Sequence, residues 1–147
     1  MQYPLIAQGG VHVGVPRPVR QIRVHYSGWD AKYDGPAAVD RAVEEVRTIL
    51  RGAEVPVILR ELGPRLPAGA RVLEAGSGTG RLGIALASMK VAEVHGVDFA
   101  ARGLALGAAT CERMGRRVRF IRADLAALPY ATESFDAVVT DSVLEHL

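Results

Sequence analysis

The chain has 147 residues, of which 49% are hydrophobic and 23% charged, and these values are typical of a single globular domain. Its net charge of +2 is too small to indicate a nucleic-acid or membrane partner, and no segment approaches the roughly 18 apolar residues of a membrane span. The single cysteine, Cys111, excludes an internal disulfide, and no cysteine–histidine pattern indicates a metal site, so we expect a cytoplasmic protein without bound metal.

The first part of the chain is expected to precede the main fold. Residues 1–35 show little periodicity and are predicted to form an extended arm. Residues 36–66 are predicted to form helices, because apolar residues recur at helical spacing from Pro36 until Gly52. A second, short helix is expected to start near Pro56.

Residues 67–147 alternate between short apolar runs and segments of helical length. Strands are predicted at 71–75, 92–97, 118–122 and 135–140, and helices at 79–88 and 101–114 with a short turn at 124–128. Strands separated by helices imply right-handed crossovers and a parallel sheet. We therefore predict an α/β, Rossmann-like doubly wound fold with about four strands.

The first of these strands leads into a glycine-rich turn that is suited to a nucleotide. Glycines adopt unusual backbone angles and let a ligand approach the amides at a helix start. The spacing Gly78-x-Gly80-x-x-Gly83 matches the dinucleotide fingerprint, and Asp98 lies 20 residues after Gly78, where a ribose-binding acid is expected. An NAD-dependent oxidoreductase fits these residues, and so does a glycine-rich turn that binds no ligand.

The residue before the glycines favours a different cofactor. Glu74 begins the pattern Glu74-x-Gly76-x-Gly78-x-Gly80, which resembles the first motif of the class I S-adenosylmethionine-dependent methyltransferases. NAD enzymes usually have an apolar or small residue where Glu74 stands. The resemblance implies that the cofactor is S-adenosylmethionine, with S-adenosylhomocysteine as its product. The residues that it assigns to the cofactor in this turn are Glu74, Gly76, Ser77, Gly78 and Gly80.

Acidic residues also follow the second and third predicted strands. The resemblance implies that Asp98, with Phe99 beside it, binds the ribose hydroxyls. It further implies that Asp124 contacts the adenine amino group and that Leu125 packs against the ring. Each acid has an ordinary alternative role, since Asp98 and Asp124 both precede predicted helices that they could cap.

The end of the chain resembles relatives that act in ubiquinone and menaquinone biosynthesis. Residues 128–139 resemble the family's LPF…SFD stretch, with tyrosine at position 130, and residues 140–147 resemble its LEHL segment. The resemblance implies that Thr140 lies beside the methionine part of the cofactor. His146 is the candidate base for an acidic acceptor, and the alternative is that it belongs to a solvated helix start.

The aromatic residues of the arm are concentrated between positions 26 and 34. This stretch resembles a segment that folds over the cofactor as a lid in relatives, where a tyrosine ring can cover the sulfonium by cation–π attraction. Tyr26 and Tyr33 are the candidates. The alternative is that they simply anchor the arm to the domain.

The leading hypothesis is therefore methyl transfer from S-adenosylmethionine to a small-molecule acceptor. The alternatives are an NAD-dependent oxidoreductase and a non-catalytic or truncated cofactor-binding half. The family's sheet has seven strands, so the chain resembles the N-terminal half of that fold. In the family's strand order (third, second, first, fourth), the apolar strand at 135–140 lies at the sheet edge, and we expect self-association there.

Overall fold

The computed structural model describes residues 12–13, 33, 35, 37–89 and 93–143. The elements are, in chain order, β1 (His12–Val13), α2 (Ala38–Leu50), α3 (Val57–Leu62), the 3-10 turn η1 (Gly63–Arg65), β2 (Arg71–Ala75), α4 (Arg81–Ala87), β3 (Glu93–Asp98), α5 (Ala101–Met114), β4 (Arg119–Arg122), the 3-10 turn η2 (Leu125–Ala127) and β5 (Ala137–Val139). Strands and helices alternate from β2 onwards, which confirms the predicted α/β, Rossmann-like class.

The strands form one parallel sheet of five strands in the order β1-β4-β3-β2-β5. The predicted order of the four main strands is confirmed, and β5 lies at one edge. The arm contributes β1, which pairs with β4 through His12 opposite Ile121. This strand was not predicted, because two residues are too few to show the alternation by which a strand is recognised.

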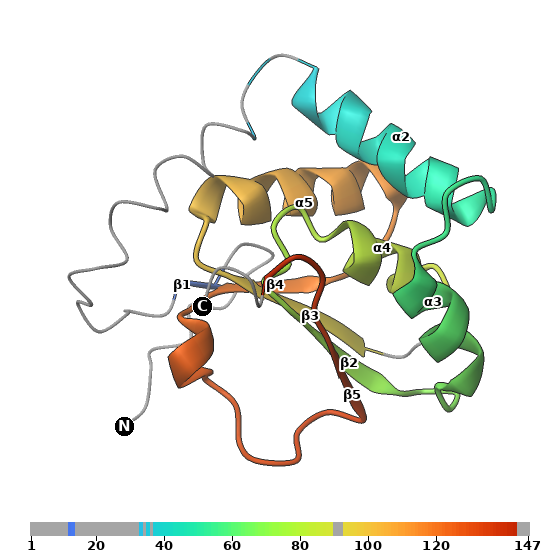
Figure 1. Cartoon of the computed structure of the whole chain (residues 1–147). Helices are drawn as coiled ribbons and strands as arrows, with labels where there is room; N and C mark the ends of the chain where they lie inside the picture. The colour runs from blue at the N-terminus through green and yellow to red at the C-terminus, as the bar shows by residue number, and fades with distance from the viewer. Residues whose placement is uncertain (1–11, 14–32, 34, 36, 90–92, 144–147) are drawn as a thin grey trace.

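Helices α2, α4 and α5 cover one face of the sheet, and α2 lies across the other two on the side away from the strands (Figure 1). Their shared core contains Val46 of α2, Ile84 of α4, Leu104 and Cys111 of α5, and Phe120 of β4. Phe120 is the buried strand residue of this cluster, which joins the three helices to the sheet.

The opposite face is crossed by the segment from residue 123 to residue 136, which runs below the sheet in Figure 1. Among the described residues, no α-helix covers this face. The cluster on it joins Leu73, Val97, Ile121 and Ala123 to Leu125, Tyr130 and Phe135 of the crossing segment. Because successive strand residues point to opposite faces, Val72 belongs to the helix-covered core while Leu73 belongs to this cluster.

The ends of the elements follow from local chemistry. Helix α5 has the predicted bounds, since Gly115 adopts a φ of 62° and the Arg116 amide donates to the Cys111 carbonyl over 2.9 Å. Strand β5 is shorter than the predicted 135–140. Asp136 instead forms two hydrogen bonds with Arg71. The Arg71 amide donates to the Asp136 carboxylate over 2.7 Å, and the Asp136 amide donates to the Arg71 carbonyl over 2.9 Å.

The approach of α5 to the glycine-rich loop gives a test of the packing. A Cβ on Gly107 would lie 2.7 Å from the Thr79 carbonyl oxygen and 2.7 Å from Cζ of Phe120. Helix propensity alone favours alanine over glycine by about 1 kcal/mol. We expect Gly107→Ala nevertheless to lower the free energy of unfolding by about 1–3 kcal/mol, because the added methyl overlaps backbone. Urea unfolding measures the change.

The control for this substitution is Ala105→Gly, at an exposed position of the same helix. It reports propensity without packing and should cost about 0.5–1 kcal/mol. A Gly107→Ala protein more stable than the parent would contradict the close approach.

Candidate functional site

The glycine-rich loop, residues 76–80, joins the carboxyl end of β2 to α4. The amides of Gly76 and Ser77 both donate to the Val97 carbonyl, over 2.8 and 2.9 Å, so the loop is held by the neighbouring strand β3. The φ angles of Gly76, Gly78 and Gly80 are 72°, 52° and 70°, in the left-handed region that favours glycine. The predicted turn is thus present at the edge of the sheet where ligands bind in this type of fold.

A Cβ added to each of these glycines would meet a different neighbour. A Cβ on Gly80 would lie 2.5 Å from the Phe120 ring, and one on Gly76 would overlap Val143. At Gly78 the nearest atom to such a Cβ is the Tyr33 hydroxyl oxygen, at 3.1 Å. Packing within the protein therefore already requires glycine at positions 76 and 80, whereas position 78 faces the aromatic residue of the arm.

Asp98 ends β3 beside this loop. One carboxylate oxygen accepts from the Gly78 amide over 2.7 Å, and the other accepts from the Ala100 amide over 2.8 Å. The second bond is close to the capping role considered as the alternative. Each carboxylate oxygen keeps a further lone pair, so ribose hydroxyls could still bind there. The neighbouring Phe99 lies under the Arg122 guanidinium, whose Cζ is 5.0 Å from the ring centre.

Glu74 is buried on the helix-covered side of the sheet. Its carboxyl oxygen accepts from the Gly83 amide in the first turn of α4, over 2.9 Å. Burial raises the pKa of Glu74 to about 8, despite the opposing effects of that hydrogen bond and of Arg81. Within the described residues, the Glu74 carboxyl group is thus hydrogen-bonded to the first turn of α4.

Asp124 and Leu125 follow β4 at the same edge of the sheet. The Asp124 carboxylate accepts from the Ala126 amide over 2.9 Å and so caps η2, which is the alternative role considered for it. The Leu125 side chain packs into the cluster on the face opposite the helices. The structure brings both residues to the edge at which Asp98 and the glycine loop lie, because β3 and β4 are adjacent and parallel.

The chain after β5 returns to the glycine loop. Asp141 forms an ion pair with Arg81 at 2.8 Å, and Val143 packs on Gly76. In the part of the chain that the structure describes, the buried side-chain oxygens without a hydrogen-bond partner are those of Ser77 and Thr140. Both were assigned to the cofactor from the sequence. Unpaired buried hydroxyls are uncommon. Ser77 lies in the glycine loop, and Thr140 directly follows β5, the strand that pairs with β2.

Sequence reasoning missed Arg81, Phe120 and Val143 at this site, and it considered only the backbone of Asp141, not its ion pair with Arg81. No sequence signal could have found them, because each acts through a contact made only after the strands have been aligned. The remaining predicted site residues, Tyr26 and His146, lie outside the described residues.

Comparison with known proteins identifies the family of the chain. A family model described as a methyltransferase domain matches residues 72–147. The demethylmenaquinone methyltransferase of Thermus thermophilus is 44% identical over 69 residues, which cover 46% of this chain and 31% of that protein. The ubiquinone biosynthesis O-methyltransferase of Methylocella silvestris is 31% identical over 132 residues, or 85% of this chain and 50% of that protein. The chain thus spans half or less of the length of these curated relatives.

A solved structure agrees at the level of the fold. A candidate S-adenosyl-L-methionine-dependent methyltransferase of Methanococcus maripaludis superposes with a TM-score of 0.61 and 18% identity, covering 75% of this chain and 51% of that one. The family match covers more than half of the sequence and includes the glycine-rich loop, Asp98 and Asp124. The chain belongs to the methyltransferase-domain family, within the class I S-adenosylmethionine-dependent methyltransferases.

Proposed function

We propose that this chain binds S-adenosylmethionine at the carboxyl edge of its sheet and transfers the methyl group to a small-molecule acceptor. The observation that carries the proposal is one cluster: the glycine loop, the Asp98 carboxylate bonded to it, and the unpaired hydroxyls of Ser77 and Thr140. When bound, the cofactor supplies an electrophilic methyl group on a sulfonium. The chain's own residues then have to bind, orient and shield it from water.

The proposed contacts divide along the edge. The Asp98 carboxylate accepts hydrogen bonds from the ribose hydroxyls through its remaining lone pairs, and Phe99 lies beside the ribose. Asp124 and Leu125 bind the adenine, one through its carboxylate and one through its backbone amide and side chain. The carboxylate of Asp124 has lone pairs left after capping η2, so the two roles are compatible.

The methionine end of the cofactor is proposed to lie over Gly76, Gly78 and Gly80, near the hydroxyls of Ser77 and Thr140. Tyr33 is proposed as part of a lid formed by the arm. Its hydroxyl would be 3.1 Å from a Cβ on Gly78, and its ring 2.9 Å from one on Gly103, which supports a place directly over the loop. Tyr26 stays a prediction.

Glu74 is proposed to act on the cofactor indirectly. Its bond to the Gly83 amide ties β2 to the first turn of α4, and the loop lies between these two elements. Because burial raises its pKa to about 8, the carboxyl group is mostly protonated at neutral pH and does not place a full charge under the cofactor.

The acceptor is proposed from the relatives' names as an intermediate of quinone biosynthesis. Methyl transfer needs in-line alignment more than acid–base chemistry, and His146 stays the candidate base where the acceptor is an acidic carbon or phenol. Incubation of the 147-residue chain with S-adenosylmethionine and demethylmenaquinone tests this through release of S-adenosylhomocysteine. Cofactor binding without turnover on any quinone would favour the second candidate, a non-catalytic cofactor-binding half.

We propose the same division of the chain as before: a lid-forming arm at 1–35, helices at 36–66 and the cofactor-binding core at 67–147. Helix α2 shares a buried cluster with α4 and α5, so the helical segment is packed onto that core. Within the described residues, no helix is both long and apolar enough to cross a bilayer. We propose a cytoplasmic location.

Self-association is proposed through β5. This strand lies at the edge of the sheet, and its Val138 side chain is 62% exposed. An edge strand leaves backbone donors and acceptors free on one side, so a second copy could pair with it.

The role of Asp98 gives a first prediction. Asp98→Ala should weaken binding of S-adenosylhomocysteine by about 1.5–3 kcal/mol, the scale of hydrogen bonds lost from a charged group. Titration calorimetry measures the affinity. The control is Asp40→Ala, which removes an exposed partner of Arg113 on α2 and should leave the affinity unchanged. Tighter binding of NAD than of S-adenosylhomocysteine by the parent chain would overturn the proposed cofactor.

Glu74 predicts a dependence of stability on pH. Its pKa rises from 4.5 to about 8 on folding, so the folded state holds the proton more tightly than the unfolded chain. The associated stabilisation is complete below pH 4.5 and is lost as the pH rises through 8. Glu74→Gln should therefore flatten the decline of stability over this range, as measured by urea unfolding at several pH values.

The control for this prediction is Glu112→Gln, on the exposed side of α5, which should leave the pH dependence of the parent unchanged. Parallel pH profiles for the parent and Glu74→Gln would show that the buried carboxyl does not titrate as proposed.

The β5 edge predicts a difference between two matched variants. Val138→Lys should shift the chain towards monomer in light scattering, because a charge on the edge strand opposes pairing. Val57→Lys, at a residue that is 63% exposed on α3, should leave the assembly unchanged. A parent chain that stays monomeric at high concentration would refute the proposed association.

A further inference from the structure

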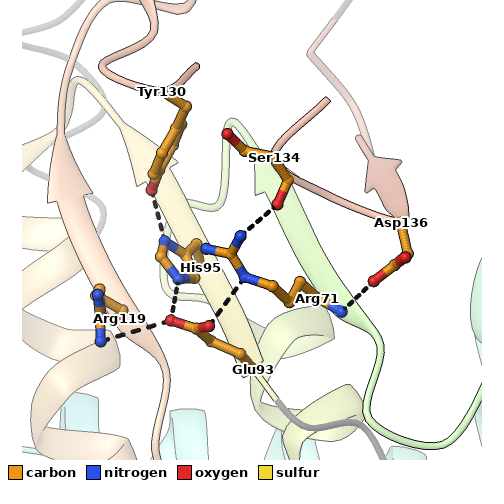
Figure 2. Close-up of polar contacts among 7 residues, drawn as sticks. All are labelled: Arg71, Glu93, His95, Arg119, Tyr130, Ser134 and Asp136. Atoms are coloured by element: carbon orange, nitrogen blue, oxygen red, sulfur yellow. Dashed lines mark hydrogen bonds and ion pairs between the residues drawn. The ribbon is translucent and has the colours of Figure 1, made fainter. Parts of the chain in front are cut away.

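A chain of hydrogen bonds lies on the sheet face opposite the helices, away from the glycine loop (Figure 2). The side chain of His95 at its centre is only 3% exposed. Its Nε2 lies 2.7 Å from a carboxylate oxygen of Glu93, and its Nδ1 lies 2.8 Å from the Tyr130 hydroxyl. These hydrogen bonds thus link Glu93 and His95 of β3 to Tyr130 in the segment that crosses this face.

The charges around His95 fix the direction of these bonds. Hydrogen bonding to His95 and Arg71 lowers the pKa of Glu93, so this group is a carboxylate and can only accept. Arg71 lies 3.0 Å from it and Arg119 lies 3.5 Å from it. Burial lowers the pKa of His95, which favours the neutral ring. His95 therefore donates from Nε2 to Glu93, and its Nδ1 accepts from the Tyr130 hydroxyl.

The Tyr130 ring would pack here without its hydroxyl. The rings of Tyr130, Phe135 and His95 meet edge to face. The ring centre of His95 lies 5.3 Å from that of Tyr130 and 5.1 Å from that of Phe135, and the last two are 4.7 Å apart. The stretch that Tyr130 occupies resembles a family pattern with phenylalanine at this position. The Tyr130 hydroxyl therefore adds a hydrogen bond to His95 on top of the packing of the three rings.

The segment that carries Tyr130 connects the two ends of the sheet. It starts at Asp124, at the carboxyl ends of the strands, and reaches their amino ends at Asp136, which is hydrogen-bonded to Arg71. The Arg71 guanidinium also donates to the Ser134 carbonyl over 2.7 Å. Residues 126–128, between the cap at Asp124 and the Tyr130 anchor, are exposed. The Ala123 amide also donates to the Asp98 carbonyl over 3.1 Å, so the segment is held both beside Asp124 and at Tyr130.

We propose that the Tyr130–His95–Glu93 chain is a positioning device that sets Asp124 and Leu125 for recognition of the adenine. The inference rests on the proposed function, since it assigns adenine contacts to those two residues. Tyr130, His95 and Glu93 act here as positioning residues, and no contact with the cofactor is assigned to them. They fix the depth at which the crossing segment lies on the sheet, and through it the place of the Asp124 carboxylate.

The experiment compares two ligands that differ at the group Asp124 would read. S-inosylhomocysteine has a carbonyl where S-adenosylhomocysteine has the adenine amino group, so the ratio of their dissociation constants reports recognition of that group. We expect the parent chain to prefer S-adenosylhomocysteine. Tyr130→Phe removes only the hydroxyl and should reduce this preference by about 3–10-fold, the range of a typical net hydrogen-bond contribution.

The matched control is Thr110→Val, which removes a buried hydroxyl on the helix-covered side, where Thr110 donates to the Leu106 carbonyl over 2.8 Å. It should leave the ratio unchanged. A second measurement without ligand is amide hydrogen exchange of residues 125–134, which should be faster in Tyr130→Phe and unchanged in Thr110→Val.

The outcomes separate the two levels of the argument. A parent chain that fails to bind S-adenosylhomocysteine overturns the proposed function, and this inference with it. A parent chain that binds both ligands equally overturns the proposed adenine contact of Asp124, and this inference with it. A parent preference that Tyr130→Phe retains in full overturns this inference alone. So does an equal loss in Thr110→Val, because the effect would then be a general loosening of the fold.

Discussion

The carbonyl oxygen of Val97 holds the site together. It accepts two amides from the glycine loop, those of Gly76 and Ser77, although it belongs to the neighbouring strand β3. The pairing of β2 with β3 therefore continues past the end of β2 into the loop. Because Asp98 follows Val97 and bonds the Gly78 amide, the loop and the acidic residue are set by the same register. A one-residue slip between these strands would remove both contacts at once.

The polar residues of the sheet are divided between its two ends. At the carboxyl edge, Asp98 and Asp124 keep lone pairs available after their bonds to backbone amides. At the far edge, Glu93 is fully engaged by arginines and by His95. The first group can therefore receive a ligand, and the second holds the chain in place. A parallel sheet allows this division because all strands begin at one edge and end at the other.

The sequence was sufficient for the regular elements and for the glycine loop. Helix α5 was predicted with the correct bounds, since apolar periodicity stops where Gly115 can close the helix. Strand β5 was predicted too long, because Phe135 and Asp136 look like strand residues until their contacts with His95 and Arg71 are known. The strand β1 and the Arg81–Asp141 pair left no local pattern.

The same limit applies to the roles of single side chains. Periodicity places Glu74 in a strand, but only the packing of α4 on that strand shows that its carboxyl group is buried against Gly83. Likewise, nothing local links His95 to Tyr130, which lie 35 positions apart in sequence. Interactions that depend on how two elements are aligned can be found only once the fold is known.

The burial of Cys111 has a practical consequence for following this molecule in solution. Burial raises the pKa of its thiol to about 11, so the reactive thiolate is scarce at neutral pH while α5 stays packed. As the single cysteine of the sequence, it is a built-in reporter for alkylating reagents. Its labelling rate would follow the opening of the interface between α2 and α5, and cofactors that tighten the core would slow that rate without any engineered probe.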